Sequence, residues 1–123
     1  MKEYKVRVYE GGIVEWRLDG KLHREDGPAE ISCNTQSWWL NGKRHREDGP
    51  AMIKNELRYQ SWWLNGERHR EDGPALIDGN YQSWWLNGIE YTEDEFNAKI
   101  SPAKELTVEQ ISNLLGYEVK IVK

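Results

Sequence analysis

Three histidines in this chain stand in the same charged setting, which makes them the first candidates for chemistry. His23, His45 and His69 are each followed by Arg-Glu-Asp and then by Gly-Pro-Ala. An imidazole beside two carboxylates could ligate a divalent metal ion or act as a general acid or base. However, an active site needs one asymmetric group of side chains, and this pattern occurs three times. We therefore expect a structural role for these stretches, with no enzyme activity and no bound metal or cofactor.

The residue types within each charged stretch favour a rigid turn. Asp26, Asp48 and Asp72 stand directly before Gly-Pro. An aspartate in that place accepts hydrogen bonds from the backbone of the turn. We expect the neighbouring arginine to bridge to a glutamate of the next copy, and the histidine to pack on a tryptophan.

Tryptophans and arginines also alternate in the chain, and this pattern suggests a second kind of chemistry. Two arginine pairs flank Trp39 and Trp63, namely Arg44 with Arg46 and Arg68 with Arg70. Aromatic rings interleaved with cations can stack the bases of a nucleic acid. The formal net charge of -4 opposes the bulk attraction that extended nucleic acid needs. A single small nucleotide, held between one tryptophan and one or two arginines, stays open as an alternative ligand.

The charged stretches belong to a repeat that runs through most of the chain. Residues 38–51 return almost unchanged as residues 62–75, a weaker copy covers residues 16–29, and a partial copy begins at Trp84. In each unit, Ser-Trp-Trp-Leu has the composition of a strand, Asn-Gly or Asp-Gly is a strong turn signal, and Ala-x-Ile begins a second strand. The sequence therefore predicts a mainly β fold of stacked antiparallel β-hairpin repeats, with three and a half units of 22–24 residues.

Strand alternation predicts which side chains share a face of this sheet. One face takes the first tryptophan of each unit, the alanines and isoleucines of the second strands, and the repeated leucines Leu18, Leu40, Leu64 and Leu86. We expect that set to be the buried core. The opposite face begins with Arg17 and is apolar from the second unit onward. Its candidate partner-binding residues, with two arginines at its rim, are Trp39, Trp63, Trp85, Met52, Leu76, Arg44 and Arg68.

The two ends of the chain depart from the repeat and predict caps on a single domain of residues 1–123. Residues 1–15 are expected to form an N-terminal cap hairpin, residues 16–88 the hairpin repeats, and residues 89–123 a small C-terminal α/β cap of helices and a strand. Terminal units of a repeat stack usually need such caps.

Two capping boxes mark the helices of the C-terminal cap. Thr92 and Thr107 are each followed three residues later by a glutamate or a glutamine. Residues 117–121 alternate as a closing strand. The second helix, which carries Ile111, Leu114 and Leu115, either covers the outer tryptophans or leaves them free, and the sequence keeps both arrangements open.

Composition restricts where the chain is expected to work. One cysteine excludes an internal disulfide framework. There is no apolar run of about 18 residues, so we expect no membrane span. The first residues also lack the apolar stretch of a secretory signal, and a cytoplasmic location is therefore expected.

The centre of each unit resembles the MORN repeat, a hairpin with a tryptophan, Asn-Gly, a basic residue and a histidine in that order. Residues 39–45 and 63–69 carry this likeness, and the chain departs from the pattern by inserting Arg-Glu-Asp before Gly-Pro-Ala. The His-Arg-Glu-Asp-Gly-Pro-Ala form resembles repeats in small proteins of bacteriophages and large DNA viruses. The tail, residues 91–122, looks like tails that end such phage proteins.

This resemblance implies a non-enzymatic binding protein. For a phage-encoded accessory protein, it implies binding to and inhibition of a host defence protein, such as a CRISPR nuclease, in the host cytoplasm. The alternative function from another class is a protein that sequesters a small nucleotide signal. A homodimer formed through the outer tryptophans is a further expectation.

Overall fold

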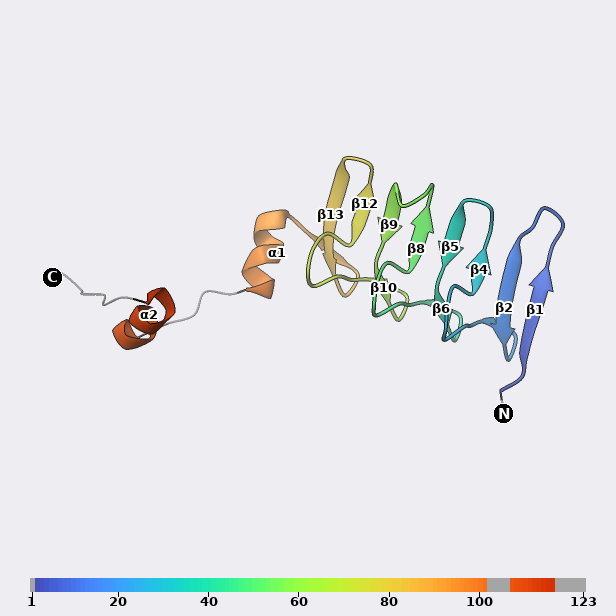
Figure 1. The fold of residues 1–123 in the computed structure, drawn as a ribbon, viewed down its shortest axis with the longest axis horizontal. Helices are drawn as coiled ribbons and strands as arrows, with labels where there is room; N and C mark the ends of the chain where they lie inside the picture. Colours follow the sequence, from blue (N-terminus) through green and yellow to red (C-terminus); the bar gives the residue numbers. More distant parts are fainter. Residues whose placement is uncertain (1, 102–106, 117–123) are drawn as a thin grey trace.

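The computed structural model describes residues 2–101 and 107–116 and has the mainly β fold that the repeats predict. Figure 1 shows antiparallel hairpins standing side by side in one elongated row. The row begins at the N-terminal hairpin and ends near a short helix, α1 (Glu93–Ile100). Each hairpin therefore has its sequence neighbours as its spatial neighbours, as in other repeat stacks.

One long antiparallel sheet forms the spine of the row. Its strands are β1 (Tyr4–Val8), β2 (Val14–Leu18), β4 (Glu30–Ile31), β5 (Thr35–Ser37), β8 (Met52–Lys54), β9 (Tyr59–Ser61), β12 (Leu76–Asp78), β13 (Tyr81–Leu86) and β14 (Ile89–Tyr91), and each pairs with the next. The short strand β3 (Lys21–Leu22) pairs with β2 beside this path.

A second row of very short hairpins lies along one edge of the spine, towards the bottom of Figure 1. β6 (Trp39–Leu40) pairs with β7 (Lys43–Arg44), and β10 (Trp63–Leu64) pairs with β11 (Glu67–Arg68). Asn41 and Gly42 join the first pair. Their φ angles of 52° and 78° place both residues in the left-handed backbone conformation. Two consecutive left-handed residues are typical of a type I′ turn, which confirms the hairpin that Asn-Gly predicts.

Backbone hydrogen bonds tie each unit to the next. Ala51 accepts from the amide of Trp38 in its own unit at 2.7 Å and donates to Ser61 of the following unit at 2.8 Å. In the row of short hairpins, Arg46 donates to Trp63 at 3.0 Å, and Gly66 donates to Arg44 at 2.9 Å. The stack is therefore held together by main-chain pairing as well as by side chains.

The buried residues confirm the alanines of the expected core and differ from it at the leucines. Side chains without exposed surface belong to the small residues Ala29, Ala51, Ala75, Ser37 and Ser61, whereas Leu18, Leu40, Leu64 and Leu86 are only half-buried. Each leucine is the last residue before a two-residue turn, where the narrow stack offers few neighbours. The predicted single strand Ser-Trp-Trp-Leu is also interrupted at Trp38 and Trp62, and only β13 is continuous.

The two helices begin and end as their capping signals predict. Thr92 and Thr107 each accept from the amide three residues later and close a full capping box. α1 packs its buried Phe96 at the β13–β14 end of the row. Gly116 ends α2 (Val108–Leu115) with a φ of 76°. The expected closing strand at residues 117–121 lies outside the described residues.

α2 bears on whether the outer tryptophans are covered. Figure 1 shows α2 beyond α1, away from the hairpins labelled β6 and β10.

Candidate functional site: a tryptophan–arginine ladder

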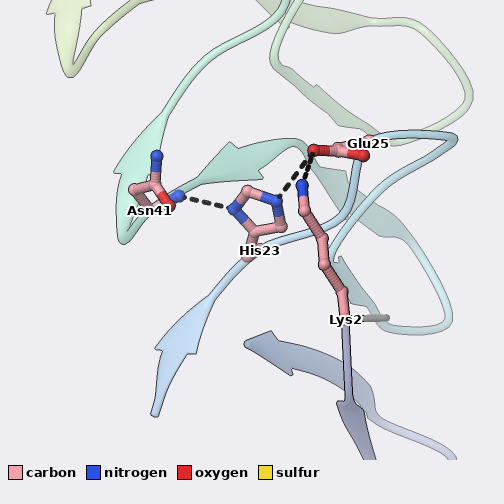
Figure 2. Close-up of polar contacts among 4 residues, drawn as sticks. All are labelled: Lys2, His23, Glu25 and Asn41. Atoms are coloured by element: carbon pink, nitrogen blue, oxygen red, sulfur yellow. Dashed lines mark hydrogen bonds and ion pairs between the residues drawn. The ribbon is translucent and has the colours of Figure 1, made fainter. Parts of the chain in front are cut away.

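Each histidine of the charged stretches links two units. Its Nδ1 atom accepts the backbone N–H of the asparagine in the next unit's turn, at 2.9 Å in all three cases, which pair His23 with Asn41, His45 with Asn65 and His69 with Asn87. Figure 2 shows the first pair, in which the other ring nitrogen of His23 lies 3.5 Å from Glu25. Figure 2 also shows Lys2 from the N-terminal segment, whose Nζ lies 2.6 Å from the same carboxylate.

The Nδ1 atoms of these imidazoles therefore join neighbouring repeat units. Their Nδ1 lone pairs are taken by backbone amides, so they are not free to bind a metal ion. Over residues 2–101 and 107–116, no three histidine, cysteine, aspartate or glutamate side chains come together as a metal site.

The arginine after each histidine binds residues of its own loop. The predicted bridge from this arginine to a glutamate of the next unit was therefore wrong. Arg46 donates from Nε to Asp48 at 2.9 Å and from Nη1 to the Pro50 carbonyl at 3.1 Å. Its guanidinium carbon also lies 4.0 Å from the ring centroid of Trp38. Arg24 and Arg70 repeat all three contacts in their own units.

Each aspartate of these loops accepts a hydrogen bond from the neighbouring arginine, and Asp48 and Asp72 also accept from the backbone, as the sequence suggested. The Arg46 guanidinium lowers the pKa of Asp48, and that of Arg70 lowers the pKa of Asp72. Both carboxylates stay exposed. Two equivalent grooves of about 680 and 690 Å³ lie between successive loops, and exposed carboxylates such as Glu47 and Asp48 line both of them.

The second tryptophan of each unit belongs to a different arrangement, in which rings and guanidinium groups alternate. The Arg44 guanidinium carbon lies 4.8 Å from the ring centroid of Trp39 and 5.1 Å from that of Trp63. The Arg68 guanidinium carbon lies 4.8 Å from the centroid of Trp63 and 5.0 Å from that of Trp85. We call this series the ladder, and its members in order are Trp39, Arg44, Trp63, Arg68 and Trp85.

The short hairpins produce this alternation. Their register places Trp39 opposite Arg44 and Trp63 opposite Arg68, so each hairpin brings one ring and one guanidinium group. Each arginine therefore makes two cation–π interactions, one with the tryptophan of its own hairpin and one with the tryptophan of the next hairpin. All five ladder residues are half-buried.

Polar contacts hold two of the three ladder rings, whereas Nε1 of Trp39 and the two guanidinium groups have none among the described residues. Nε1 of Trp63 and Nε1 of Trp85 each donate at 2.8 Å to a buried serine of the spine, Ser61 or Ser83. The guanidinium groups of Arg44 and Arg68, in contrast, make no hydrogen bond and no ion pair within the described part of the chain, and the Nε atom of each is buried. Burial lowers the pKa of Arg44 because it removes water from the charged group.

The remaining candidate residues lie beside the ladder. Met52 stands opposite Ser61 in the spine register and Leu76 stands opposite Ser61 and Ser83, the serines that hold the ladder rings, and both are half-buried. The structure thus brings the seven sequence-predicted site residues to one face. Arg44 and Arg68 lie between tryptophans rather than at the rim that the sequence predicted.

The ladder has defined ends. In the first unit, Arg17 stands opposite Leu22 where later units pair tryptophan with arginine, and Arg17 pairs with Glu15 at 3.1 Å. In the fourth unit, Trp85 stands opposite Glu90. The same hairpin therefore forms with or without a tryptophan–arginine pair.

No helix within the described ranges is long and apolar enough to span a membrane. Comparisons with models of known protein families, with curated proteins and with solved structures find no match.

Proposed function

We propose that the chain is a non-enzymatic binding protein, and that the ladder with Met52 and Leu76 is the face that binds another protein. One observation carries the proposal: two half-buried guanidinium groups, those of Arg44 and Arg68, stand between tryptophan rings, and their buried Nε atoms have no hydrogen-bond partner within the described ranges. Tryptophan and arginine are the residues most enriched among interface hot spots.

The rigidity of the ladder supports this role. Each ring of Trp63 and Trp85 is held by a serine and stacks against guanidinium groups, so little side-chain freedom is left to lose on binding. Preorganised side chains bind more tightly because less entropy is lost in the complex.

The same contacts favour a protein partner over the alternative small nucleotide. Trp63 already has one guanidinium group from the unit before it and one from its own hairpin. A base would have to displace an arginine to stack there. The grooves between the charged loops offer carboxylates, which repel phosphate.

The identity of the partner is proposed from the resemblance to viral repeat proteins rather than from geometry. On that basis the partner is a host protein in the host cytoplasm, with a defence nuclease such as a CRISPR effector as the specific hypothesis.

The test exchanges one ladder pair for the pair that the first unit already contains. Trp63→Arg combined with Arg68→Leu reproduces the Arg17–Leu22 hairpin and leaves the net charge unchanged. We expect the hairpin to form and the melting temperature to change little. Capture of the partner from host lysate should fall by about thirtyfold in affinity, which is the typical effect of losing a hot spot of 2 kcal/mol.

Glu47→Gln is the matched control, because Glu47 lines the grooves and not the ladder. Normal capture by Glu47→Gln and loss in the ladder variant support the proposal. The reverse result would place the binding site in the grooves, and quenching of tryptophan fluorescence by a nucleotide without protein capture would favour the sequestering protein.

A further inference from the structure

Arg44 and Arg68 differ from the other half-buried arginines of the stack in their electrostatic pairing. Arg17 has Glu15 beside it, and the arginines of the charged loops each have an aspartate within 2.9 Å. The guanidinium groups of Arg44 and Arg68 lie against tryptophan rings, and neither forms an ion pair in the described part of the chain. Glu30 acts on Arg44 electrostatically without forming an ion pair with it. Both cations therefore lack a direct carboxylate partner in a protein whose net charge is negative.

The spacing of these two cations is limited by the ring between them. Each guanidinium carbon lies about 5 Å from the centroid of Trp63, so the two carbons are at most about 10 Å apart. In an extended strand, residues two positions apart lie about 7 Å from one another and their side chains point to the same side. Two glutamates in that spacing can span the remaining distance with their flexible side chains.

We infer that the ladder binds an extended acidic segment of the partner, with one carboxylate on Arg44 and another on Arg68. This inference rests on the proposed function and names the chemistry of the segment that the ladder recognises. The segment crosses the edge of Trp63 between its two anchoring carboxylates. Each carboxylate would supply the partner that the buried guanidinium group lacks.

Charge-assisted hydrogen bonds explain why such a segment would bind more tightly to the ladder than to an ordinary protein surface. A guanidinium group presents a planar set of donors that matches a carboxylate, and such pairs are shorter and stronger than neutral hydrogen bonds. Burial of Arg44 has already removed part of its water, as the lowered pKa of this group indicates. Less water therefore has to be displaced when the carboxylate arrives.

An acidic peptide fits these observations better than a nucleic acid. The charged loops carry exposed glutamates and aspartates in three consecutive units, and these would repel a long polyanion. Met52 and Leu76 beside the ladder also offer apolar surface to the side chains of a peptide.

The experiment titrates the full chain with a peptide of alternating threonine and glutamate, followed by tryptophan fluorescence. A peptide with glutamine in place of every glutamate, and an oligothymidylate of similar length, are the comparison ligands. We expect the glutamate peptide to bind at least about tenfold more tightly than the glutamine peptide. The affinity should fall with rising salt.

Protein variants locate the effect. Arg44→Gln combined with Arg68→Gln should lose about tenfold or more in affinity for the glutamate peptide. Lys43→Gln removes an exposed cation next to Arg44 and should bind the peptide as the unaltered chain does. Circular dichroism of each variant verifies that the stack has formed.

Three results would overturn the inference: equal binding of the two peptides, equal loss in Lys43→Gln, or preferential binding of the oligothymidylate. Its failure can be told apart from failure of the proposed function. If the arginine variants capture the host partner normally while the Trp63→Arg and Arg68→Leu exchange does not, the ladder binds a protein but not through acidic side chains. If neither set changes capture, both proposals are wrong.

Discussion

The Nδ1 atom of His45 accepts the backbone N–H of Asn65 at 2.9 Å, across the boundary between two repeat units. The same contact joins His23 to Asn41 and His69 to Asn87 at the same distance. Each of these histidines, whose side chain is of a type common in catalysis, therefore accepts a hydrogen bond from the turn of the neighbouring hairpin. The histidines explain part of the precision with which the units repeat.

Removing this contact should destabilise the stack in proportion to the burial of the histidine. We expect His45→Ala and His69→Ala to lower the free energy of unfolding by similar amounts, about 0.5–1.5 kcal/mol each. His23→Ala should cost more, because His23 is 4% exposed and also packs near Tyr4. Urea denaturation of the three variants tests this order, and a His23 variant as stable as the unaltered chain would contradict it.

The acid limb of the stability curve should depend on the aspartates of the charged loops. The pKa of Asp48 is lowered from its ordinary value of 3.8, chiefly by the hydrogen bond from Arg46. A carboxyl whose folded pKa is lowered stabilises the fold above its ordinary pKa, and this contribution is lost as the pH falls through the folded pKa. We expect the melting temperature to fall as the pH drops below 3.8, and the fall to be shallower in Asp48→Asn.

Asp78→Asn is the control for that measurement, since Asp78 is an exposed aspartate of β12 outside the charged loops. If the Asp48 and Asp78 variants show the same acid limb, the pairing of Asp48 with Arg46 does not contribute to stability.

The sequence predicted the local features of the fold because those features depend on a few adjacent residues. Asn41-Gly42 is a left-handed turn, and Thr92 and Thr107 close capping boxes, as their motifs indicate. The predicted core was right at its alanines and wrong at its leucines, because burial depends on how closely successive units approach. Close approach leaves room only for small side chains such as Ala51 and Ser61.

The ladder could have been derived in part. A two-residue turn pairs the residues on either side of it, so Asn41-Gly42 already places Trp39 opposite Arg44. What the sequence does not contain is the offset between neighbouring hairpins, which brings Arg44 within 5.1 Å of the next ring, that of Trp63. The contact of Arg46 with Asp48 was not predicted either. Both an aspartate and a glutamate lie near this arginine in the sequence, and the sequence does not show which carboxylate the arginine binds.

The loop between β8 and β9 contains a strained position that can be relieved. Asn55, Glu56 and Leu57 are all left-handed, with φ angles of 51°, 54° and 76°. The left-handed region costs a residue with a side chain about 1–2 kcal/mol, whereas glycine enters it freely. Leu57 is 58% exposed, so its side chain returns little stabilisation in exchange.

We therefore expect Leu57→Gly to raise the free energy of unfolding by about 0.5–1 kcal/mol, after allowing for the extra entropy of glycine in the unfolded chain. Leu57→Ala keeps the strain and should change it little. Thermal melting of both variants is the measurement, and a glycine variant less stable than the alanine variant would show that the loop is not strained.

The spacing between units should be intolerant of larger side chains at the buried alanines. Ala51 has no exposed surface and is hydrogen-bonded within its own unit and to the following unit. Ala51→Leu should lower the free energy of unfolding by about 1–3 kcal/mol through overpacking. Ala98→Leu, at an exposed position of α1, should stay within about 0.5 kcal/mol of the unaltered chain. Equal stability of the two variants in urea denaturation would mean that the stack can open to accept the larger side chain.

The central claim is that the ladder is the binding face, and the indole N–H signals of the seven tryptophans test it most directly. A two-dimensional nitrogen–proton NMR spectrum resolves one such signal for each tryptophan, and it is recorded with and without the captured partner. The ladder predicts that Trp39, Trp63 and Trp85 shift or broaden, while Trp16, Trp38, Trp62 and Trp84 keep their positions. Changes centred on Trp38 and Trp62, whose rings stack on the charged loops and line the grooves, would contradict it.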